Sequence, residues 1–563
     1  MRRLNLLLTV LLISVFVLSA CASPAATPAA SSDAPVAEDS NAPAATEAQS
    51  ADPVTQPEEE KVLRFIHGLF DMDWSPLRGG GWPARYVSMF WAPPMWVDME
   101  GTIHPGVFNE WSSNADYTVW TFKIDPNAKF SDGSAITSAD VKGTWEMACL
   151  PSTQHQRVSL FLAGVEGFDA AKVGDSLELP GVVAVDASTI EVRLTAPDPV
   201  FSSRIATNLL PPVKISQARG ADGKEVSEWW HVKNNPAYSG PYMPVSMDLD
   251  RGEQEYVKNP NWWGPEPKID RLTFVTVEDM QTQTLMLQQG EADVAVFLDL
   301  PTTHDDLGPE FVGTNQPATP VFQYFWINSY VAPMDDINCR KALIMSVNRE
   351  EMFKVSKPFG PGSAGSTLLA PIVGDAGAAA FPYDPEAAKA AFAECSYSAA
   401  MPRIILAGIS NPSAQAAGEY IVEQWRQVLG VTEVELNAKF DELAKTDQGK
   451  VQIFRDDAGT RFPDAVSVLQ ATVYSKSGNA QTKMGNYLNA ALDAKIEEAA
   501  TKTADDPLRL ELAIEAEKIV MEDWVFLPWY NEGPLMRAMP YVTGYAKNLD
   551  WQVMEPWNLD IVK

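Results

Sequence analysis

The side chains that could bind a metal ion or act as nucleophiles are few in this chain of 563 residues. The histidines are scattered without the spacing of metal ligands, and they are His67, His104, His155, His231 and His304. Apart from Cys21, the cysteines are Cys149, Cys339 and Cys395, which form no CxxC pair and lie in segments with helical apolar spacing. We expect these three to be buried small hydrophobes rather than disulfide partners or reactive thiols. We expect no metal site and no cofactor.

One glycine pattern, from Gly360 to Gly365, fits the GxGxxG motif of dinucleotide-binding proteins. Such a site needs a strand before the motif and a helix after it, so that helix amides meet the pyrophosphate. Here Lys357-Pro358-Phe359 precedes the motif and no amphipathic helix follows, so we predict a loop. The chain also contains no GxxxxGK(S/T), HExxH or GxSxG motif. A secreted hydrolase that acts on oligosaccharides or esters stays open as an alternative, because catalytic groups can meet in space without a sequence motif.

The N-terminus has the pattern of a secretory signal. Arg2 and Arg3 precede an apolar run from Leu6 to Leu18, and Leu18-Ser19-Ala20-Cys21 resembles the bacterial lipobox, after which the cysteine is diacylated. The run is shorter than the about 20 apolar residues that a transmembrane helix needs. We predict that residues 1–20 are a lipoprotein signal peptide and that Cys21 carries a lipid anchor.

Residues 22–60 are dominated by Ala, Pro, Ser, Thr and acids, and they contain eight acids and no base. Such a composition cannot bury enough apolar surface to fold, so residues 21–60 are predicted to be the acylated Cys and a disordered tether. The whole chain has 43 Lys and Arg against 74 Asp and Glu, a formal charge of −31. Because this charge repels a phosphate backbone, we expect no nucleic-acid partner.

The remaining residues alternate strand-like and helix-like segments, which is typical of α/β domains, and their number favours two or three domains. The strand candidates are residues 62–67, 118–124, 189–194, 272–277, 321–327 and 403–407. Thr137 to Asp140 has the spacing of a capping box ahead of a helix over 141–149. Asp384-Pro385 and Asp506-Pro507 each provide an N-cap acid followed by Pro at the first helical position.

Several short motifs follow one another along the chain, and they are Asn109 to Trp111, Thr118 to Ile124, Lys129 to Ser134, Thr137 to Val141, Ser239 to Tyr242, Asn259 to Gly264, Gln289 to Asp293, Pro333 to Leu343 and Phe526 to Tyr530. In this order they resemble the motifs of family 5 bacterial extracellular solute-binding proteins, the oligopeptide, dipeptide and nickel receptors of ABC importers. The resemblance covers about residues 61–560.

The resemblance implies a two-lobed α/β fold of the periplasmic-binding-protein type II-like class, with an extra domain in the N-terminal lobe (cluster C). The core of lobe I would comprise residues 61–95, 230–322 and 535–563. Residues 96–229 would form the inserted domain II, and residues 323–534 would form lobe II.

The same resemblance implies a monomeric receptor that binds a small solute, a peptide or an oligosaccharide, between its lobes. Its partners would be ABC permease and ATPase subunits, and it would lie outside the cytoplasm on the bacterial cell membrane, in the periplasm or on the outer surface. It would catalyse no reaction. A surface sensor that works without a transporter is an alternative with the same fold.

Peptide receptors of this family place a carboxylate near the ligand's α-amino group, within a stretch that resembles (A/C)-D-Y-x-(D/E)-P. The matching stretch here runs from Thr460 to Ala465, with Arg461 at the acidic position. A guanidinium favours a carboxylate, a phosphate or a hydroxyl array. A register shift would instead bring Asp456 or Asp457 into place, and Arg461 could also pair with Asp457 or Asp464. The candidate ligand-binding residues from this stretch are Arg461, Asp457 and Asp464.

Tryptophans are concentrated between Phe70 and Pro105, a Gly/Pro-rich segment that in the family leads from the first strand to the cleft rim. Indole faces can stack on sugar rings or on apolar side chains, and they also serve as packing anchors. Trp82 and Trp91 are the further ligand-binding candidates, and oligosaccharides are an alternative to peptides.

Overall fold

The computed structural model describes residues 60–68, 74–79, 86–98, 102–296, 321–358, 362–369, 373, 380–438, 451–459, 464–476, 487–532, 536–544 and 555–562. The predicted signal peptide, Cys21, Trp82 and Arg461 lie outside these residues. Among the helices of the described residues, none is long and apolar enough to cross a membrane.

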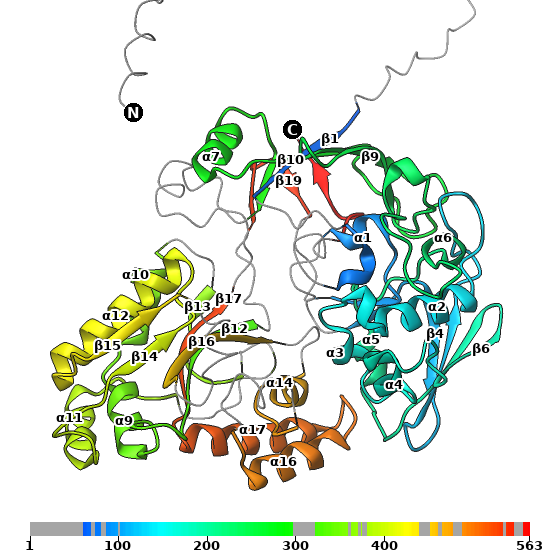
Figure 1. Cartoon of the computed structure of the whole chain (residues 1–563). Coiled ribbons are helices and arrows are strands. Elements are labelled where there is room, and N and C mark those ends of the chain that lie inside the picture. The colour runs from blue at the N-terminus through cyan, green and yellow to red at the C-terminus, as the bar shows by residue number, and fades with distance from the viewer. Residues whose placement is uncertain are drawn as a thin grey trace, which may run out of the picture. The chain divides into compact units, whose positions relative to one another are not determined.

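Sheet I has six strands in the order β18-β11-β1-β10-β9-β8 (Figure 1). Their bounds are β1 Val62–His67, β8 Tyr242–Asp248, β9 Glu253–Lys258, β10 Arg271–Thr276, β11 Val294–Val296 and β18 Met536–Ala538. The central strand β1 pairs in parallel with both β10 and β11. Arg64 of β1 donates two hydrogen bonds to the buried Asp293 that precedes β11, at 2.9 and 2.8 Å, which fixes these two strands together.

Sheet II also has six strands, in the order β13-β17-β12-β16-β14-β15. Their bounds are β12 Val321–Ile327, β13 Gly362–Ala364, β14 Ile404–Ala407, β15 Val434–Asn437, β16 Ile453–Gly459 and β17 Phe526–Glu532. Strand β12 pairs antiparallel with β16 and β17. All seven of its residues are buried, as expected for a central strand covered on both faces.

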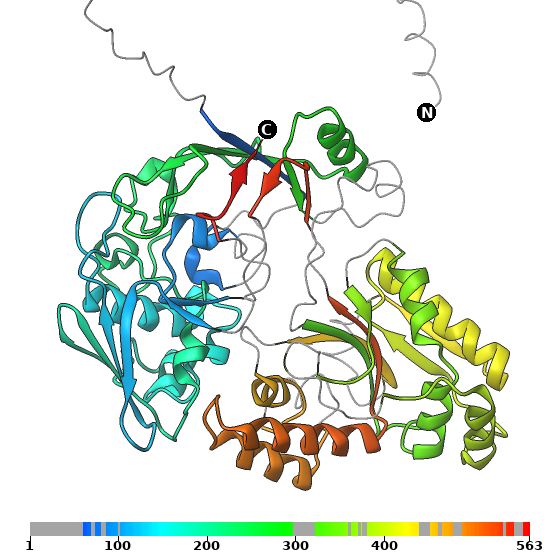
Figure 2. The ribbon, with the colours of Figure 1, turned by 180° about the vertical axis from the view of Figure 1, so that it is seen from behind.

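Helices surround sheet II, and Figure 2 shows them from behind. Their bounds are α9 Ile337–Met345, α10 Arg349–Ser356, α11 Pro385–Glu394, α12 Pro412–Leu429, α14 Ala465–Thr472, α16 Ala490–Ala500 and α17 Pro507–Glu522. Asp384 and Asp506 accept hydrogen bonds from the first amides of α11 and α17, which confirms both predicted N-caps. On α17, Leu512, Ala516 and Val520 are buried, so this helix packs an apolar stripe against the core.

Sheet III is antiparallel, in the order β4-β5-β7-β6, with bounds β4 Phe108–Ser113, β5 Val119–Ile124, β6 Val182–Asp186 and β7 Thr189–Arg193. Helix α2, Ser138–Cys149, begins at the predicted capping box, in which the side chain of Thr137 accepts from the Asp140 amide and the side chain of Asp140 accepts from the Thr137 amide. The other short elements are α1 Val87–Phe90, β2 Met95–Val97, β3 Ile103–Pro105, α3 Val158–Leu162, α4 Phe168–Val173, α5 Phe201–Ile205, α6 Ile215–Ala218, α7 Met280–Gln288, β19 Val542–Thr543 and β20 Asp560–Ile561.

Three larger clusters of buried apolar side chains occur among the described residues, one around each of these sheets. Gly240 illustrates why small residues are required where two segments meet. A Cβ atom at this position would lie 2.5 Å from the carbonyl carbon of Phe90, and the Gly240 amide donates to the Phe90 carbonyl oxygen at 2.8 Å. The close approach of the backbones explains the glycine of the Ser239 to Tyr242 stretch.

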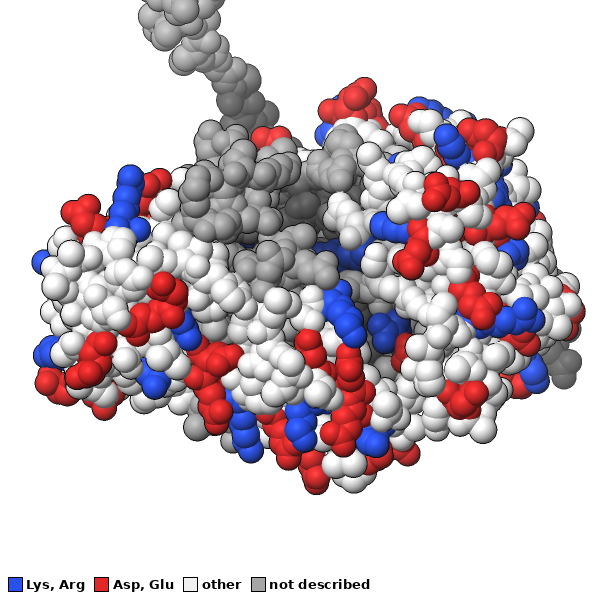
Figure 3. Space-filling model, turned by 60° about the horizontal axis from the view of Figure 1, so that its bottom comes forward, with Lys and Arg blue, Asp and Glu red and all other residues white. Residues whose placement is uncertain are grey.

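The surface carries charges of both signs. Figure 3 shows acidic and basic side chains interspersed on one face of the molecule. Exposed ion pairs among the described residues include Lys495 with Glu515 and Lys476 with Glu497, both at 2.8 Å. Because such pairs lie in solvent, they contribute little to stability individually.

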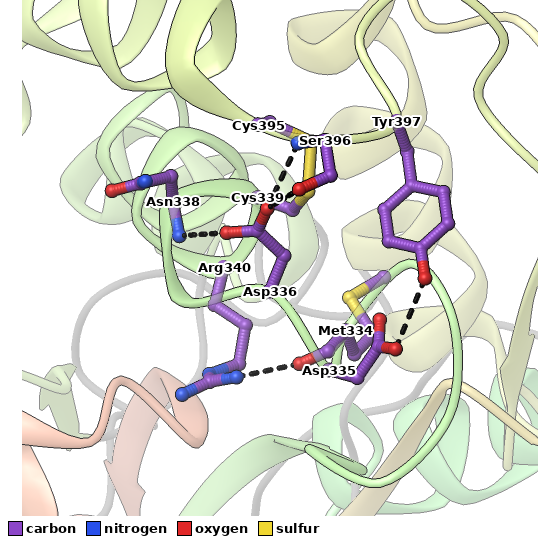
Figure 4. The surroundings of a disulfide bond; sticks show 9 residues. All are labelled: Met334, Asp335, Asp336, Asn338, Cys339, Arg340, Cys395, Ser396 and Tyr397. Carbon is purple, nitrogen blue, oxygen red and sulfur yellow. Dashed lines mark hydrogen bonds between the residues drawn. A yellow bond between two sulfur atoms is a disulfide. The ribbon is translucent and has the colours of Figure 1, made fainter.

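Two sequence predictions are corrected by the structure. Cys339 and Cys395 form a disulfide between the start of α9 and the end of α11 (Figure 4), whereas Cys149 is a buried free cysteine, as predicted. The pairing was missed because helical spacing shows that a cysteine is buried without showing what it faces. Within the GxGxxG pattern, Gly362 to Ala364 form the edge strand β13 rather than a loop, because they pair with β17.

Candidate functional site

The chain passes from sheet I to sheet II between β11 and β12, and returns between β17 and β18. The first residue of β12 and the last residue of β17 therefore lie at the same side of sheet II, where the strands meet the two crossing segments. Strand β16 runs antiparallel to β12, and its last residue, Gly459, pairs with Val321. These three strand ends thus lie together, and we call the adjoining part of sheet II, from Gly459 back to Arg455 of β16, the hinge edge of sheet II.

Arg455 of β16 is the half-buried cation of this edge. Its Nη2 donates to Oε1 of Gln323 on β12, and its guanidinium carbon lies 6.0 Å from the centroid of the Trp529 ring. Its Nε is buried and has no hydrogen-bond partner among the described residues. A buried guanidinium N–H without a partner is costly, and a ligand oxygen can satisfy it.

Lys357 provides a second cation, placed directly after α10. The residue is 8% exposed, and its Nζ lies 5.2 Å from the centroid of the Tyr530 ring. The neighbouring Trp529 is held in place because its indole Nε1 donates to Oγ of Ser356 at 2.8 Å. Consecutive aromatic residues of β17 therefore lie against the two cations.

Asp456 and Asp457 place negative charge on the same strand as Arg455. In the register of the sheet, Asp457 pairs with Gln323 and Asp456 pairs with Tyr324. Burial raises the pKa of Tyr324 well above its usual value, and the charges of Asp456 and Asp457 raise it further. Tyr324 is therefore neutral at physiological pH, and its hydroxyl has no hydrogen-bond partner among the described residues. The hinge edge thus combines cations, carboxylates and a neutral hydroxyl.

Two of the predicted ligand-binding residues make structural contacts. Trp91 is 2% exposed, and its ring packs 5.2 Å from that of Trp229 and 4.7 Å from that of Tyr238. Asp464 is the N-cap of α14, and its carboxylate accepts two hydrogen bonds from Arg509. Burial acts to raise the pKa of Asp464, but the hydrogen bonds and charge of Arg509 together with the hydrogen bonds from Ser467 outweigh it, so the pKa is lowered. The third, Asp457, lies at the hinge edge.

On sheet I the corresponding strand end is that of β1, at His67. His67 is fully buried, and burial lowers its pKa to about 2, so it is neutral at physiological pH. Trp74 and Tyr86, from the Trp-rich segment that follows β1, are both buried, and their rings stack at 6.2 Å. Trp74 and Tyr86 therefore pack into the core rather than lining an open site.

Comparison with known proteins decides the family. The model of bacterial extracellular solute-binding proteins, family 5 Middle, matches residues 102–480. This chain belongs to that family.

Known relatives of this family 5 protein match it over most of their length. The periplasmic oligopeptide-binding protein OppA of Haemophilus influenzae is 25% identical over 513 residues, which is 87% of this chain and 92% of the relative. The dipeptide-binding protein DppE of Bacillus subtilis is 24% identical over 448 residues, 76% of this chain and 78% of the relative. Heme-binding protein A of Haemophilus influenzae is 25% identical over 467 residues, 79% of this chain and 82% of the relative.

Solved structures show the fold of this family 5 protein. The murein tripeptide-binding protein MppA in its unliganded open form matches with a TM-score of 0.74 and 22% identity, covering 90% of this chain and 98% of that one. Haemophilus influenzae OppA in complex with the peptide RPPGFSPFR matches with a TM-score of 0.69 and 22% identity, covering 90% of this chain and all of that one. The fold is therefore the two-lobed α/β fold of periplasmic binding proteins, as the sequence predicted.

Sequence reasoning missed Arg455, Gln323 and Lys357 as candidate site residues. Arg455 and Gln323 lie 132 residues apart and meet only because β12 and β16 are neighbours in sheet II. One signal was available: Arg455 and the two aspartates after it follow Ile453-Phe454, so charges occur inside an otherwise apolar strand.

Proposed function

We propose that this protein captures a peptide outside the cytoplasm and delivers it to the permease of an ABC importer. The observation that supports this most directly is the hinge edge of sheet II, where Arg455 presents an N–H group with no partner among the described residues, on the strand that also carries Asp456 and Asp457. The oligopeptide- and dipeptide-binding names of its relatives point to the same class of ligand.

A peptide fits the hinge edge because it carries both kinds of charge. A peptide carboxylate would bind Arg455, with Lys357 adding positive charge, since charge-assisted hydrogen bonds to a guanidinium are the stronger kind. The α-amino group would be stabilised by Asp457 or Asp456. An oligosaccharide has no formal charge to match either group, so a peptide is the better candidate. Arg461 would add a further cation if it takes the position where peptide receptors of the family carry an acid.

The finer parts of the proposal concern where the protein works. The disulfide between Cys339 and Cys395 supports an extracytoplasmic location, since disulfides persist in oxidising compartments. The lipobox-like sequence before Cys21 supports a lipid anchor, and residues 22–60 would be a tether long enough to let the folded part reorient. The receptor would act as a monomer on the cell surface or in the periplasm.

Replacement of Arg455 by alanine tests the ligand site. First, mass spectrometry of solutes that co-purify with the native protein identifies the ligand. Calorimetric titration of that ligand should then show at least a tenfold loss of affinity in Arg455→Ala, because a hydrogen bond to a charged group contributes roughly 1.5 to 3 kcal/mol. Arg461→Ala is titrated in parallel.

Arg403→Ala is the matched control, because Arg403 is an exposed arginine of the same lobe that pairs with Glu435 on the neighbouring strand β15. The control should bind as tightly as the wild type. Equal affinities of Arg455→Ala and the wild type would reject the hinge edge as the ligand site, and a co-purifying neutral oligosaccharide would reject the peptide.

A further inference from the structure

A cavity of about 170 Å³ lies apart from the hinge edge. It is enclosed by the segment that leads into α5 and by the helices α14, α16 and α17. Asp198 and Arg204 lie on one wall, and Gln470 of α14, Ala500 of α16 and Arg509 of α17 lie on the other. At roughly 30 Å³ for each water molecule, the cavity has room for about five waters. Two regions that are far apart in sequence therefore face each other across a space that water can fill.

The wall near α5 presents a fixed ion pair. Nε of Arg204 donates to Oδ2 of Asp198 at 3.0 Å, and Oδ1 of Asp198 accepts from the Val200 amide at 3.1 Å. The Asp198 carbonyl oxygen in turn accepts from Nε1 of Trp120 at 3.2 Å, which ties this wall to strand β5 of sheet III. The side chains of Arg204 and Asp198 are 22% and 19% exposed, so both can still contact a group that approaches through the cavity.

On the opposite wall, the side chains of Gln470 and its neighbour Arg509 differ in how many hydrogen bonds they make. Arg509 is 3% exposed, and all three of its guanidinium nitrogens donate to protein oxygens. Gln470 is half-buried, and its side-chain amide makes no hydrogen bond to another described residue. An amide offers two donors and one acceptor, which suits a carboxylate and a guanidinium at the same time.

We propose that Gln470 is a closing contact that docks on the Asp198–Arg204 pair when the two walls come together. In the closed state the Gln470 carbonyl accepts from Arg204 and its NH₂ group donates to Asp198, while the cavity water leaves. The polar groups of the lining alternate with apolar ones such as Leu194, Pro197 and Val200, and water can replace the Gln470 bonds when the walls separate, so the contact is reversible. The inference rests on the proposed function in one respect, because the purpose of this closure would be to capture the solute.

Cysteine cross-linking of the full-length protein without ligand tests the contact. The pair Ala196→Cys with Gln470→Cys joins the two walls. The control pair is Ala196→Cys with Gln424→Cys, which uses a half-buried glutamine of α12 that does not line the cavity. The native Cys149 will not interfere, because it is buried and burial raises the pKa of its thiol to about 12.

Under mild oxidation, the Ala196–Gln470 pair should cross-link at least ten times faster than the control pair, and cross-linking should reduce the radius of gyration measured by X-ray scattering. Equal rates for the two pairs, or a cross-linked protein with an unchanged radius, would overturn the proposal.

A second measurement needs no cross-link. Spin labels at Val185→Cys and Leu510→Cys, two exposed positions on β6 and α17, report the distance between the walls in the free protein. Gln470→Leu should at least halve the short-distance population, because leucine can neither accept from Arg204 nor donate to Asp198, and Gln424→Leu should leave it unchanged. Identical distance distributions in wild type and Gln470→Leu would contradict the contact. Because neither experiment uses a ligand, a failure of the peptide proposal would not alter these results.

Discussion

Arg509 and Asp464 form a two-pronged ion pair, with Nε of Arg509 2.7 Å from Oδ1 of Asp464 and Nη2 2.8 Å from Oδ2. Nη1 of the same arginine donates to the carbonyl oxygens of Ala499 and Lys502 at the C-terminal end of α16. Asp464 also accepts from the Ser467 amide at 2.8 Å as the N-cap of α14. A cation therefore lies at the negative end of one helix dipole and a carboxylate at the positive end of another.

Removing the cation from this pair should be strongly destabilising. Arg509→Met leaves Asp464 buried without its counter-ion, so the free energy of unfolding should fall by about 3 to 5 kcal/mol. Urea unfolding followed by circular dichroism measures the change. Lys476→Met, which removes the cation of a solvent-exposed pair with Glu497, is the control and should have a far smaller effect. Equal effects of the two variants would show that the Arg509 pair contributes no more than a surface pair.

Stability should decrease in mild acid because two histidines are buried as neutral groups. Burial lowers the pKa of His67 to about 2 and that of His155 to about 4. In the unfolded chain both titrate near pH 6.5, so the unfolded state alone gains protons as the pH falls below that value. Their stabilising effect is therefore complete above about pH 6.5. Each histidine should lower the free energy of unfolding by about 2 kcal/mol between pH 6.5 and pH 5.

Urea unfolding at several pH values between 5 and 7.5 measures how steeply the free energy of unfolding changes with pH. His67→Gln has one fewer titrating group, so its stability should vary less with pH than that of the wild type. His104→Gln is the control, because His104 is partly exposed and pairs with Asp98 at 2.6 Å. An unchanged slope in His67→Gln would contradict the role given to His67.

The disulfide should stabilise the region around α9 and α11. It closes a loop with a sequence separation of 56, so a double replacement of Cys339 and Cys395 by Ala should cost about 4 kcal/mol in the chain-entropy model. Asp336 accepts from the amides of Asn338 and Ser396, both at 2.8 Å, and these bonds should persist in the variant. Thermal unfolding of wild type and variant, each with and without reductant, measures the effect. A reductant-sensitive melting temperature in the variant would show that another thiol pair is responsible.

Much of the local structure could be predicted from the sequence because the interactions that set it are local. The helix starting after Thr137 depends on a capping box within four residues, and those after Asp384 and Asp506 depend on an N-cap acid and the proline that follows it. Strands such as 62–67 and 321–327 were predictable because β-branched and aromatic residues favour them. The family could also be recognised, because its motifs are short and follow a fixed order along the chain.

Only the tertiary structure decided which distant side chains meet. Cys339 and Cys395 are separated by 56 positions, Asp464 and Arg509 by 45, and Gln323 and Arg455 by 132. No periodicity in the sequence specifies such pairs, because each depends on strand order and on how helices pack against a sheet. The sequence could place an acid at position 464, but only the packing of α14 against α16 and α17 made that acid the partner of Arg509.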